Sequence, residues 1–477
     1  MTTGHLPAIS RRLENAAFCL LLIAVALAPL PFGSNGPEST WLLSGLSGLI
    51  LLTTALAAVL DPARVSMPKA RLLKAAAACF AFFGVWAIVQ ILPGLPAGLA
   101  HPLWSTAAAT LHQPARATVS IDPEATLSAL AKATGYFAIG ISTLLLLRDA
   151  RRRRLAVAVL ILAGGLYAAY GLIGLAAGDC CVAWQKKTSY FGVATGPFIN
   201  RNSFATYLGL IALTSLGLML RSFGELRRIS APTFARRTAL TFRLLAADRW
   251  LETVTLVAAL AALLLTQSRA GITSCILGAL ALASLASYAD VFSSRGRRWM
   301  PVTGLAAVLA AGVVAFGGAY LGRIANEGFE DVDRTQSWQI VVTGIEASPW
   351  LGHGFGTFPE AFPLYRDDRL DSRRHWDKAQ DTYLELALDM GIPATFVLLA
   401  GFAALVALCW KGLSRRRRER RIFPAIGIAA TVLVGAHSVY DFSMQIPAIA
   451  TTFAFIMAIA LTESGIWRAP VDQSSAT

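Results

Sequence analysis

Apolar runs of about 20 residues recur from one end of the chain to the other, and they limit the fold more than any other feature of the sequence. A helix of about 20 residues is long enough to cross the hydrocarbon core of a bilayer. Helices and closed barrels satisfy all their backbone hydrogen bonds there. We therefore predict an all-α polytopic membrane protein with about twelve transmembrane helices, near residues 14–33, 41–60, 72–93, 126–147, 155–177, 202–220, 250–267, 271–290, 301–321, 382–410, 423–440 and 445–463.

The composition argues against a soluble enzyme. Of the 477 residues, 55% are hydrophobic and 15% are charged, whereas soluble domains carry about 25% charged residues. The first apolar run, residues 16–31, lacks a small-residue cleavage pattern and is followed by further runs. We therefore expect a retained first helix rather than a cleaved signal peptide.

Basic residues gather on alternate loops between the predicted spans. With the N-terminus inside, the inward segments hold 29 of the 42 lysines and arginines, and the outward segments hold 13. This asymmetry is the one that the positive-inside rule describes, so both termini are expected in the cytoplasm. The net charge of +14 is explained by this topology, and we do not expect nucleic acid as a partner.

The six cysteines do not suggest a disulfide framework. Cys19, Cys79, Cys275 and Cys409 fall inside apolar runs, where cysteine behaves as a small hydrophobic residue. The adjacent pair 180–181 lies on the outer side without a partner in another outward loop. No spacing of cysteine and histidine resembles a ligand set, so neither a metal nor a cofactor is expected.

The longest loop sets the domain organisation. We expect transmembrane helices 1–9 in residues 1–321, an extracytoplasmic cap in 322–381, helices 10–12 in 382–463 and a cytoplasmic tail in 464–477. Within the cap, apolar residues recur at helical spacing over 334–347, and three glycines at 352, 354 and 356 suggest a tight turn before another short helix. The cap is therefore expected to be ordered. On the inner side, the basic segment 221–249 is expected to carry an amphipathic interfacial helix.

Arg269 is the first candidate for chemistry, because it lies at a tight outward turn between two spans. One interpretation is a snorkelling arginine that anchors a helix end. The other is an anion clamp, since a guanidinium suits bidentate contacts with phosphate and nearby helix N-termini add backbone N–H donors.

The segment Asn200-Arg201-Asn202 precedes another span. Either asparagine can cap that helix. Capping alone does not explain two asparagines beside an arginine, a cluster that would suit sugar hydroxyls or a pyrophosphate.

Two further segments carry titratable groups. Residues 376–385 open the tenth predicted span, where Asp381 or Thr382 can cap the helix, and His375 is the nearest group suited to proton transfer near neutral pH. His437 and Asp441 are four residues apart, which predicts a structural pair on one helix face.

Six motifs follow one another along the chain: SIDPEAT before a span, GPFINRNSFA opening a span, TQSRAG at an outward turn, Arg334-x-x-x-Trp338 leading to SPWLGHGFGTF in the cap, AQDTYLELALDMGIP, and HSVYDFSMQIPA. Taken together, the order and the side of these motifs resemble the bacterial O-antigen ligase and polysaccharide polymerase superfamily over most of the chain from about residue 90.

The resemblance implies a GT-C-like, all-helical glycosyltransferase of the bacterial inner membrane. Such proteins take a glycan from undecaprenyl pyrophosphate at the periplasmic face and pass it to an acceptor, either another lipid-linked glycan or a lipid A core. Arg269 best matches the family's arginine for the pyrophosphate, with Arg201 and Arg334 as second choices. Asn200, Asn202 and Tyr383 are further expected substrate contacts. No metal or nucleotide is implied, because arginines replace the cation.

One position departs from the family, whose ligases generally read Ala-His-Asn where this chain reads Ala379-Gln380-Asp381. Glutamine cannot act as a general base, although it can hold a hydroxyl or phosphate by hydrogen bonds. Either Asp381 or His375 supplies the base, or the reaction depends on stabilising the leaving group, or this member has lost activity. An alternative for the whole chain is a transporter or flippase of an anionic lipid-linked glycan.

Overall fold

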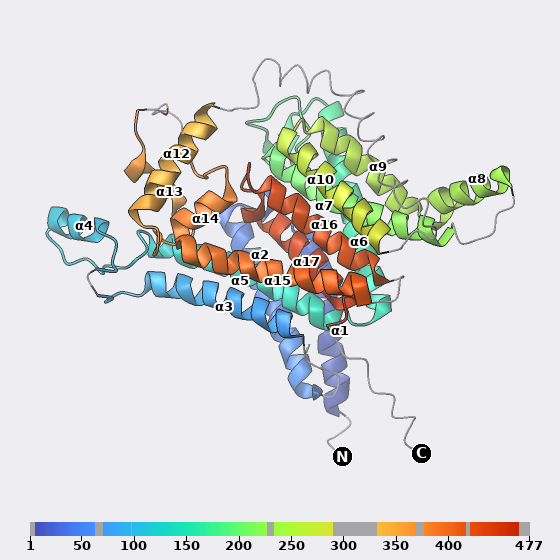
Figure 1. Ribbon diagram of the computed structural model, residues 1–477, viewed down its shortest axis with the longest axis horizontal. Helices are drawn as coiled ribbons and strands as arrows, with labels where there is room; N and C mark the ends of the chain where they lie inside the picture. The colour runs from blue at the N-terminus through green and yellow to red at the C-terminus, as the bar shows by residue number, and fades with distance from the viewer. Residues whose placement is uncertain are drawn as a thin grey trace.

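The computed structural model describes residues 5–62, 70–96, 98–226, 233–289, 332–368, 370, 376–415 and 420–466. The regular secondary structure of these residues is almost all helical (Figure 1). A two-stranded antiparallel hairpin, β1 (Cys181–Val182) with β2 (Gln185–Lys186), precedes α7. The helices are α1 (His5–Leu27), η1 (Phe32–Ser34), α2 (Pro37–Leu60), α3 (Arg71–Ile91), α4 (Leu103–Leu111), α5 (Pro123–Leu146), α6 (Ala150–Ala176), α7 (Arg201–Leu226), α8 (Phe234–Arg243), η3 (Leu244–Asp248), α9 (Trp250–Leu265), α10 (Arg269–Tyr288), α12 (Val332–Ala347), α13 (Phe358–Tyr365), α14 (Thr382–Met390), α15 (Ile392–Arg415), α16 (Ile422–His437), η6 (Ser443–Gln445) and α17 (Pro447–Glu463).

The apolar helices fit a polytopic membrane protein. Within the described ranges, seven helices are long and apolar enough to cross a bilayer: α2, α3, α5, α6, α7, α10 and α15. Three shorter helices, α9, α16 and α17, are also apolar. Each of these helices lies at a predicted span, and α1 covers most of the first one. The predicted span at 301–321 lies outside the described residues.

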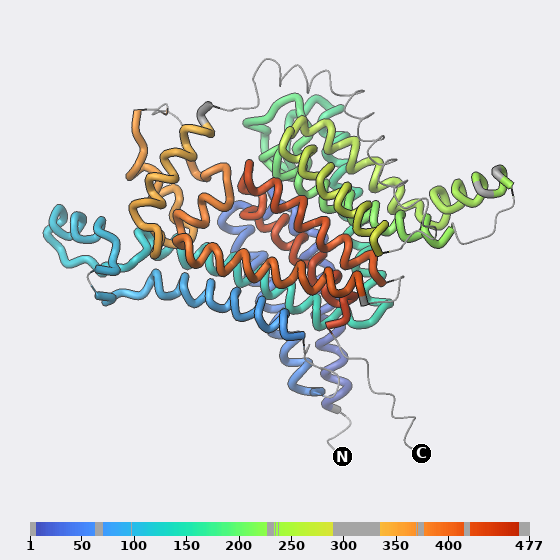
Figure 2. Tube along the Cα trace, viewed as in Figure 1, coloured from blue at the N-terminus to red at the C-terminus, as the bar shows by residue number. Residues whose placement is uncertain are grey.

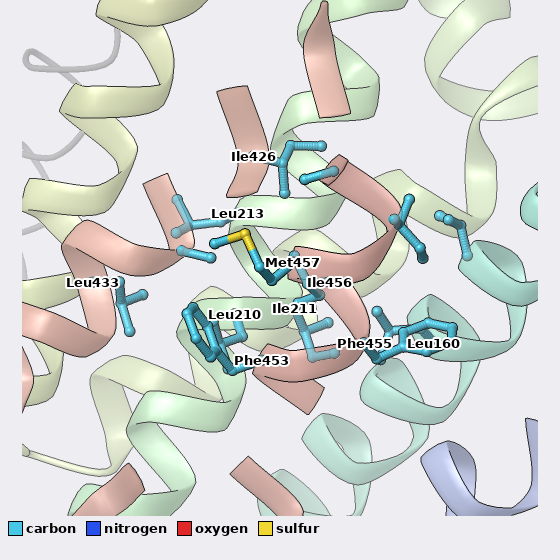
Figure 3. Close-up of a cluster of buried hydrophobic side chains, with 14 of the residues drawn as sticks. Leu160, Leu210, Ile211, Leu213, Ile426, Leu433, Phe453, Phe455, Ile456 and Met457 are labelled. Atoms are coloured by element: carbon cyan, nitrogen blue, oxygen red, sulfur yellow. The ribbon is translucent and has the colours of Figure 1, made fainter. Parts of the chain in front are cut away.

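Helices α7 and α17 form the centre of the bundle. Helix α7 packs against α6, α9, α10, α16 and α17, and it is the most buried of the seven long helices. A helix that is apolar on all sides belongs in the interior of a large protein or a membrane bundle. Figure 3 shows how side chains from α6, α7, α16 and α17 interlock there, among them Leu160, Leu210, Ile211, Leu213, Ile426, Leu433, Phe453, Phe455, Ile456 and Met457.

The cap expected in the long loop is ordered where the structure describes it. Helices α12, α13 and α14 lie together near α4, at the end of the α3–α15 pair opposite α8 (Figures 1 and 2). Their shared apolar cluster includes Ile340, Phe358, Phe362 and Leu388. The turn between α12 and α13 uses the three predicted glycines, all of which have positive φ.

His353, in that turn, is completely buried. Its ring stacks on Tyr365 at 5.4 Å between centroids and meets the edge of His101 at 5.1 Å. The histidine thus ties the turn to α13 and to the segment that precedes α4.

The tenth predicted span, 382–410, is not one helix. Gly391 has a φ of 78° and separates α14 from α15. A Cβ at this position would lie 2.5 Å from the carbonyl oxygen of Trp350, so the close approach of the cap turn requires glycine. Helix α14 packs into the cap cluster, and α15 alone is long enough to span a bilayer. The predicted basic amphipathic helix corresponds to α8, which projects from the bundle (Figure 1).

Candidate functional site

Helix α7 begins at the motif with two asparagines. Asn200 is the capping residue, as its side-chain oxygen accepts a hydrogen bond from the backbone N–H of Asn202 at 2.8 Å. Arg201 is the first residue of the helix, and its guanidinium carbon lies 5.6 Å from the centre of the Tyr190 ring. This geometry is a cation–π contact between the segment that follows the hairpin and the helix end.

Helix α10 begins in the same way beside it. Ser268 caps the helix by accepting from the N–H of Gly271 at 3.1 Å, and Arg269 is the first helical residue. A Cβ on Gly271 would lie 2.4 Å from the Cβ of Ala205, so the two helices approach closely at this point.

A partly buried hydrogen bond joins the two helix ends. The hydroxyl of Ser268 donates to the side-chain oxygen of Asn202 at 2.8 Å, which gives Asn202 a structural role. Two helix N-termini, each beginning with an arginine, therefore lie side by side. The backbone N–H groups and the helix dipole at each N-terminus favour a negatively charged ligand, and each arginine adds a charge suited to phosphate.

Arg334, in the first turn of α12, acts through its charge on Tyr190, the same residue that Arg201 contacts. Burial and the Asp441 carboxylate raise the pKa of Tyr190, while Arg201 and Arg334 oppose that rise. The charges of both arginines and of Asp441, in the segment after α16, therefore all affect the pKa of Tyr190. Arg201 and Arg334 both act on Tyr190 although the two arginines are 133 positions apart in the sequence.

The segment before α14 is fixed through Ala379. Its carbonyl accepts from the Trp338 indole N–H at 3.1 Å, and its N–H donates to Glu385 at 2.8 Å. The second oxygen of Glu385 lies 3.3 Å from the ammonium of Lys378. Gln380, the next residue, has a φ of 58°, which is uncommon for a residue with a side chain. The contacts around Ala379 therefore determine where Gln380 lies.

Asp381, one of the two cap candidates from the sequence, caps α14. Its Oδ1 accepts from the backbone N–H groups of Tyr383 and Leu384 at 2.8 and 3.0 Å. The residue is 7% exposed, and burial raises the pKa of Asp381 against the opposing effect of those two hydrogen bonds. The other oxygen, Oδ2, takes no part in the cap.

The first turn of α14 rests on the segment that ends α16. The Tyr383 hydroxyl donates to the carbonyl of Gly435 at 2.9 Å, and the N–H of Thr382 donates to the carbonyl of Ser438 at 2.8 Å. His437 and Asp441 lie 4.0 Å apart and both are buried. The predicted pair is confirmed, whereas the prediction that both residues lie on one helix face was wrong. Helix α16 ends at His437, and a turn brings Asp441 back towards it.

Two sets of contacts join these segments. A hydrogen bond joins the start of α10 to α7, and Trp338 of α12 and Tyr383 of α14 connect the segment before α14 with the end of α16 and the turn after it. His375 lies outside the described residues. The described part of the chain contains no group of three or more histidine, cysteine, aspartate or glutamate side chains arranged to hold a metal.

Sequence reasoning missed Tyr190 and the positioning role of Glu385. Tyr190 lies in a polar loop, and its partner Arg201 is 11 positions away, so no local pattern connects them. Glu385 gave a weak signal, because a carboxylate one turn after a helix cap often interacts with the backbone before that cap.

Comparison with known protein families gives one match that is relevant to the site. Residues 254–399 match the family described as O-Antigen ligase. The match supports the O-antigen ligase and polymerase superfamily, in agreement with the resemblance of the motifs. It contains Arg269, Arg334, Gln380 and Asp381. Comparison with curated proteins gives no significant match.

Proposed function

We propose, from its place in the O-antigen ligase and polymerase superfamily, that this integral membrane protein transfers or polymerises a glycan carried on undecaprenyl pyrophosphate. The acceptor is the hydroxyl of another lipid-linked glycan or of a lipid A core. The site faces the periplasm in the bacterial inner membrane, and both termini are cytoplasmic. We also propose that the protein has twelve membrane helices, a cap that extends to Gly391 and a GT-C-like fold.

One observation carries the proposal: the N-termini of α7 and α10 lie side by side, and each begins with an arginine. We assign the pyrophosphate of the donor to this position, with Arg201 and Arg269 as its main contacts and Arg334 at its edge. Arginines and helix N-termini stabilise the charge that develops on the leaving pyrophosphate. Asn200 and Asn202 shape the two helix ends.

The proposed reaction is a substitution at the anomeric carbon of the donor sugar. The acceptor oxygen forms a bond to that carbon, the bond to the pyrophosphate oxygen breaks, and the lipid pyrophosphate leaves with the electron pair. The acceptor proton passes to Oδ2 of Asp381, because Gln380 cannot accept it. A raised pKa makes a carboxylate a stronger base. Gln380 orients the acceptor hydroxyl by a hydrogen bond, and Tyr383 supports the same edge of the site.

Purified protein in liposomes with radiolabelled undecaprenyl-pyrophosphate glycan tests the proposal. Transfer predicts labelled glycan on the acceptor, or longer lipid-linked chains, with release of undecaprenyl pyrophosphate. Movement of the label across the bilayer without a new glycosidic bond would instead indicate a transporter or flippase. If the protein neither transfers the glycan to any acceptor nor moves it across the bilayer, that result would indicate an inactive member of the superfamily.

A further inference from the structure

Two aromatic side chains lie beside the segment that carries Gln380. The indole N–H of Trp338, in α12, donates to the carbonyl of Ala379 at 3.1 Å, so this ring is held directly beside the residue before Gln380. The ring of Tyr440, in the turn after α16, has its centroid 6.2 Å from that of Trp338, with an angle of 42° between the rings. The two rings, here called the aromatic pair, therefore border the segment at which the acceptor oxygen is placed.

The turn that carries Tyr440 is fixed against the start of α14. The carbonyls of Ser438 and Asp441 accept from the N–H and the hydroxyl of Thr382, each at 2.8 Å. The backbone N–H of Tyr440 donates to the carbonyl of His437 at 2.9 Å. The side chain of Tyr440 is nevertheless 48% exposed, although His437 and Asp441 are buried. Backbone contacts therefore hold this aromatic ring at the surface and leave much of the ring uncovered.

The aromatic pair lies between the two reacting parts of the proposed site. Arg334 precedes Trp338 by four residues on α12, so the two side chains lie on one helix face about 6 Å apart along the axis. Arg334 stands at the edge of the proposed pyrophosphate position, and Gln380 stands where the acceptor hydroxyl is expected. In a glycosyl transfer, the sugar that changes its bond lies between these two groups. The space beside the aromatic pair is therefore the place for a sugar ring.

A pyranose ring suits an exposed aromatic pair of this kind. Its axial C–H groups form an apolar face and its hydroxyls form a polar edge, so the ring stacks on an aromatic face while its hydroxyls reach hydrogen-bonding groups. The Gln380 amide on one side and the Arg334 guanidinium on the other are groups of that kind. A protein partner would need a much wider surface than two rings, about 800 Å² on each side.

We infer that Trp338 and Tyr440 form a stacking platform for the sugar ring at which the new bond is made. The inference rests on the proposed function and adds a contact for the sugar itself to those for the pyrophosphate. Two sugars meet at this point, the first sugar of the donor and the terminal sugar of the acceptor, and they share the same chemistry. Tyr440 is the residue to test, because Trp338 also holds Ala379 in place.

Binding to the purified full chain in lipid nanodiscs tests the platform without requiring catalysis. The variants are Tyr440→Ala, Tyr440→Phe and the control Phe242→Ala, whose exposed ring lies on α8, at the end of the molecule opposite the cap (Figure 1). Three probes are used: undecaprenyl pyrophosphate, the same lipid carrying the oligosaccharide repeat of the cell's surface polysaccharide, and that oligosaccharide in free form, added after saturation with undecaprenyl pyrophosphate.

The loss of one stacking ring predicts that Tyr440→Ala binds a sugar-bearing probe about fivefold more weakly than the wild type. Its affinity for undecaprenyl pyrophosphate alone should not change, because that probe has no sugar. Tyr440→Phe keeps the ring, and Phe242→Ala lies far from the site, so both should bind all three probes as the wild type does. A loss with the glycan-bearing lipid assigns the platform to the donor sugar, and a loss with the free oligosaccharide assigns it to the acceptor sugar.

The inference is overturned if Tyr440→Ala and the wild type bind both sugar-bearing probes alike, or if the variant loses undecaprenyl pyrophosphate to the same extent. It is also overturned if Tyr440→Phe binds as weakly as Tyr440→Ala, since stacking needs the ring and not the hydroxyl. Glycan transfer is measured on the same preparations. Sugar binding that depends on Tyr440 without any transfer would contradict the proposed function and leave the platform standing. Transfer with sugar binding that does not depend on Tyr440 would do the opposite.

Discussion

Asp381 combines two functions that a single substitution can separate. Asparagine is as good a helix cap as aspartate, because its side-chain oxygen accepts the same backbone N–H bonds. It cannot act as a general base. We therefore expect Asp381→Asn to preserve the thermal stability of the purified protein and to lower the rate of glycan transfer by about 10²-fold or more. Transfer at the wild-type rate in a stable Asp381→Asn protein would remove Asp381 as the base.

Gln380 occupies a backbone conformation that histidine adopts more readily than most residues. Gln380→His should therefore fold normally and keep or raise the transfer activity, since it introduces the histidine that O-antigen ligases generally carry at this place. An imidazole with a pKa of about 6.5 acts as a base only when deprotonated. The added activity should accordingly decline as the pH falls through that value.

Gln380→Asn is the matched control, because asparagine also tolerates positive φ but has no group that titrates in this range. The pH profile of this variant should follow that of the wild type. A complete loss of activity in Gln380→His would show that the glutamine has a specific role of its own.

At the scale of single residues, sequence analysis identified most of the candidate site. Arg201, Arg269, Arg334 and Asp381 were named from the position and the chemistry of local motifs, and the structure links those motifs in space. Tyr190 was missed because its contacts join segments that no local spacing relates. The roles of all these residues remain proposals.

At the scale of elements, the predicted spans agree with helices to within a few residues at most boundaries, because an apolar helix in a bilayer is specified by its own composition. The break at Gly391 was missed because a contact with a distant segment causes it, and not the local composition. The apolar pattern continues through residues 384–399, and the contact that ends α14 comes from the carbonyl of Trp350 in the cap turn. A distant backbone contact leaves no periodic signal in the sequence.

Gly391→Ala tests this account of the break. The added Cβ meets the Trp350 carbonyl, and the residue is forced into a strained backbone conformation, which costs about 1–3 kcal/mol. We expect a lower melting temperature in detergent and looser packing of the cap. Gly174→Ala in α6 is the control, because a Cβ there meets no atom within 4 Å. Equal melting temperatures for the two variants would contradict the proposed contact.

At the scale of the whole molecule, we expect the stability of the cap to depend on pH through His353. Burial, with a smaller effect of His101, lowers the pKa of His353 to about 4 from 6.5. The folded state therefore favours neutral histidine, so its contribution to stability is complete above pH 6.5 and is lost as the pH falls towards 4. The difference corresponds to about 3 kcal/mol.

His353→Phe keeps a ring between His101 and Tyr365 but binds no proton. Melting temperatures measured between pH 7 and pH 4 should fall less steeply for this variant than for the wild type. His112→Asn, at the exposed end of α4, should leave the slope unchanged. A wild-type slope in His353→Phe would exclude His353 as the cause.

The proposed topology and the proposed site together explain where the arginines lie along the chain. In the proposed topology the inward arginines follow the positive-inside rule, and several of the arginines that it places outward, including Arg201, Arg269 and Arg334, belong to the motifs of the candidate site. The central claim is that the helix ends of α7 and α10 bind a lipid pyrophosphate through Arg201 and Arg269.

The most direct test is the affinity of the purified protein for undecaprenyl pyrophosphate, measured in detergent for the wild type, Arg201→Ala, Arg269→Ala and the exposed control Arg116→Ala. A hydrogen bond to a charged group contributes about 1.5–3 kcal/mol. The account therefore predicts that affinity falls at least about tenfold with each site arginine removed and is unchanged in the control. Wild-type affinity in both Arg201→Ala and Arg269→Ala would contradict it.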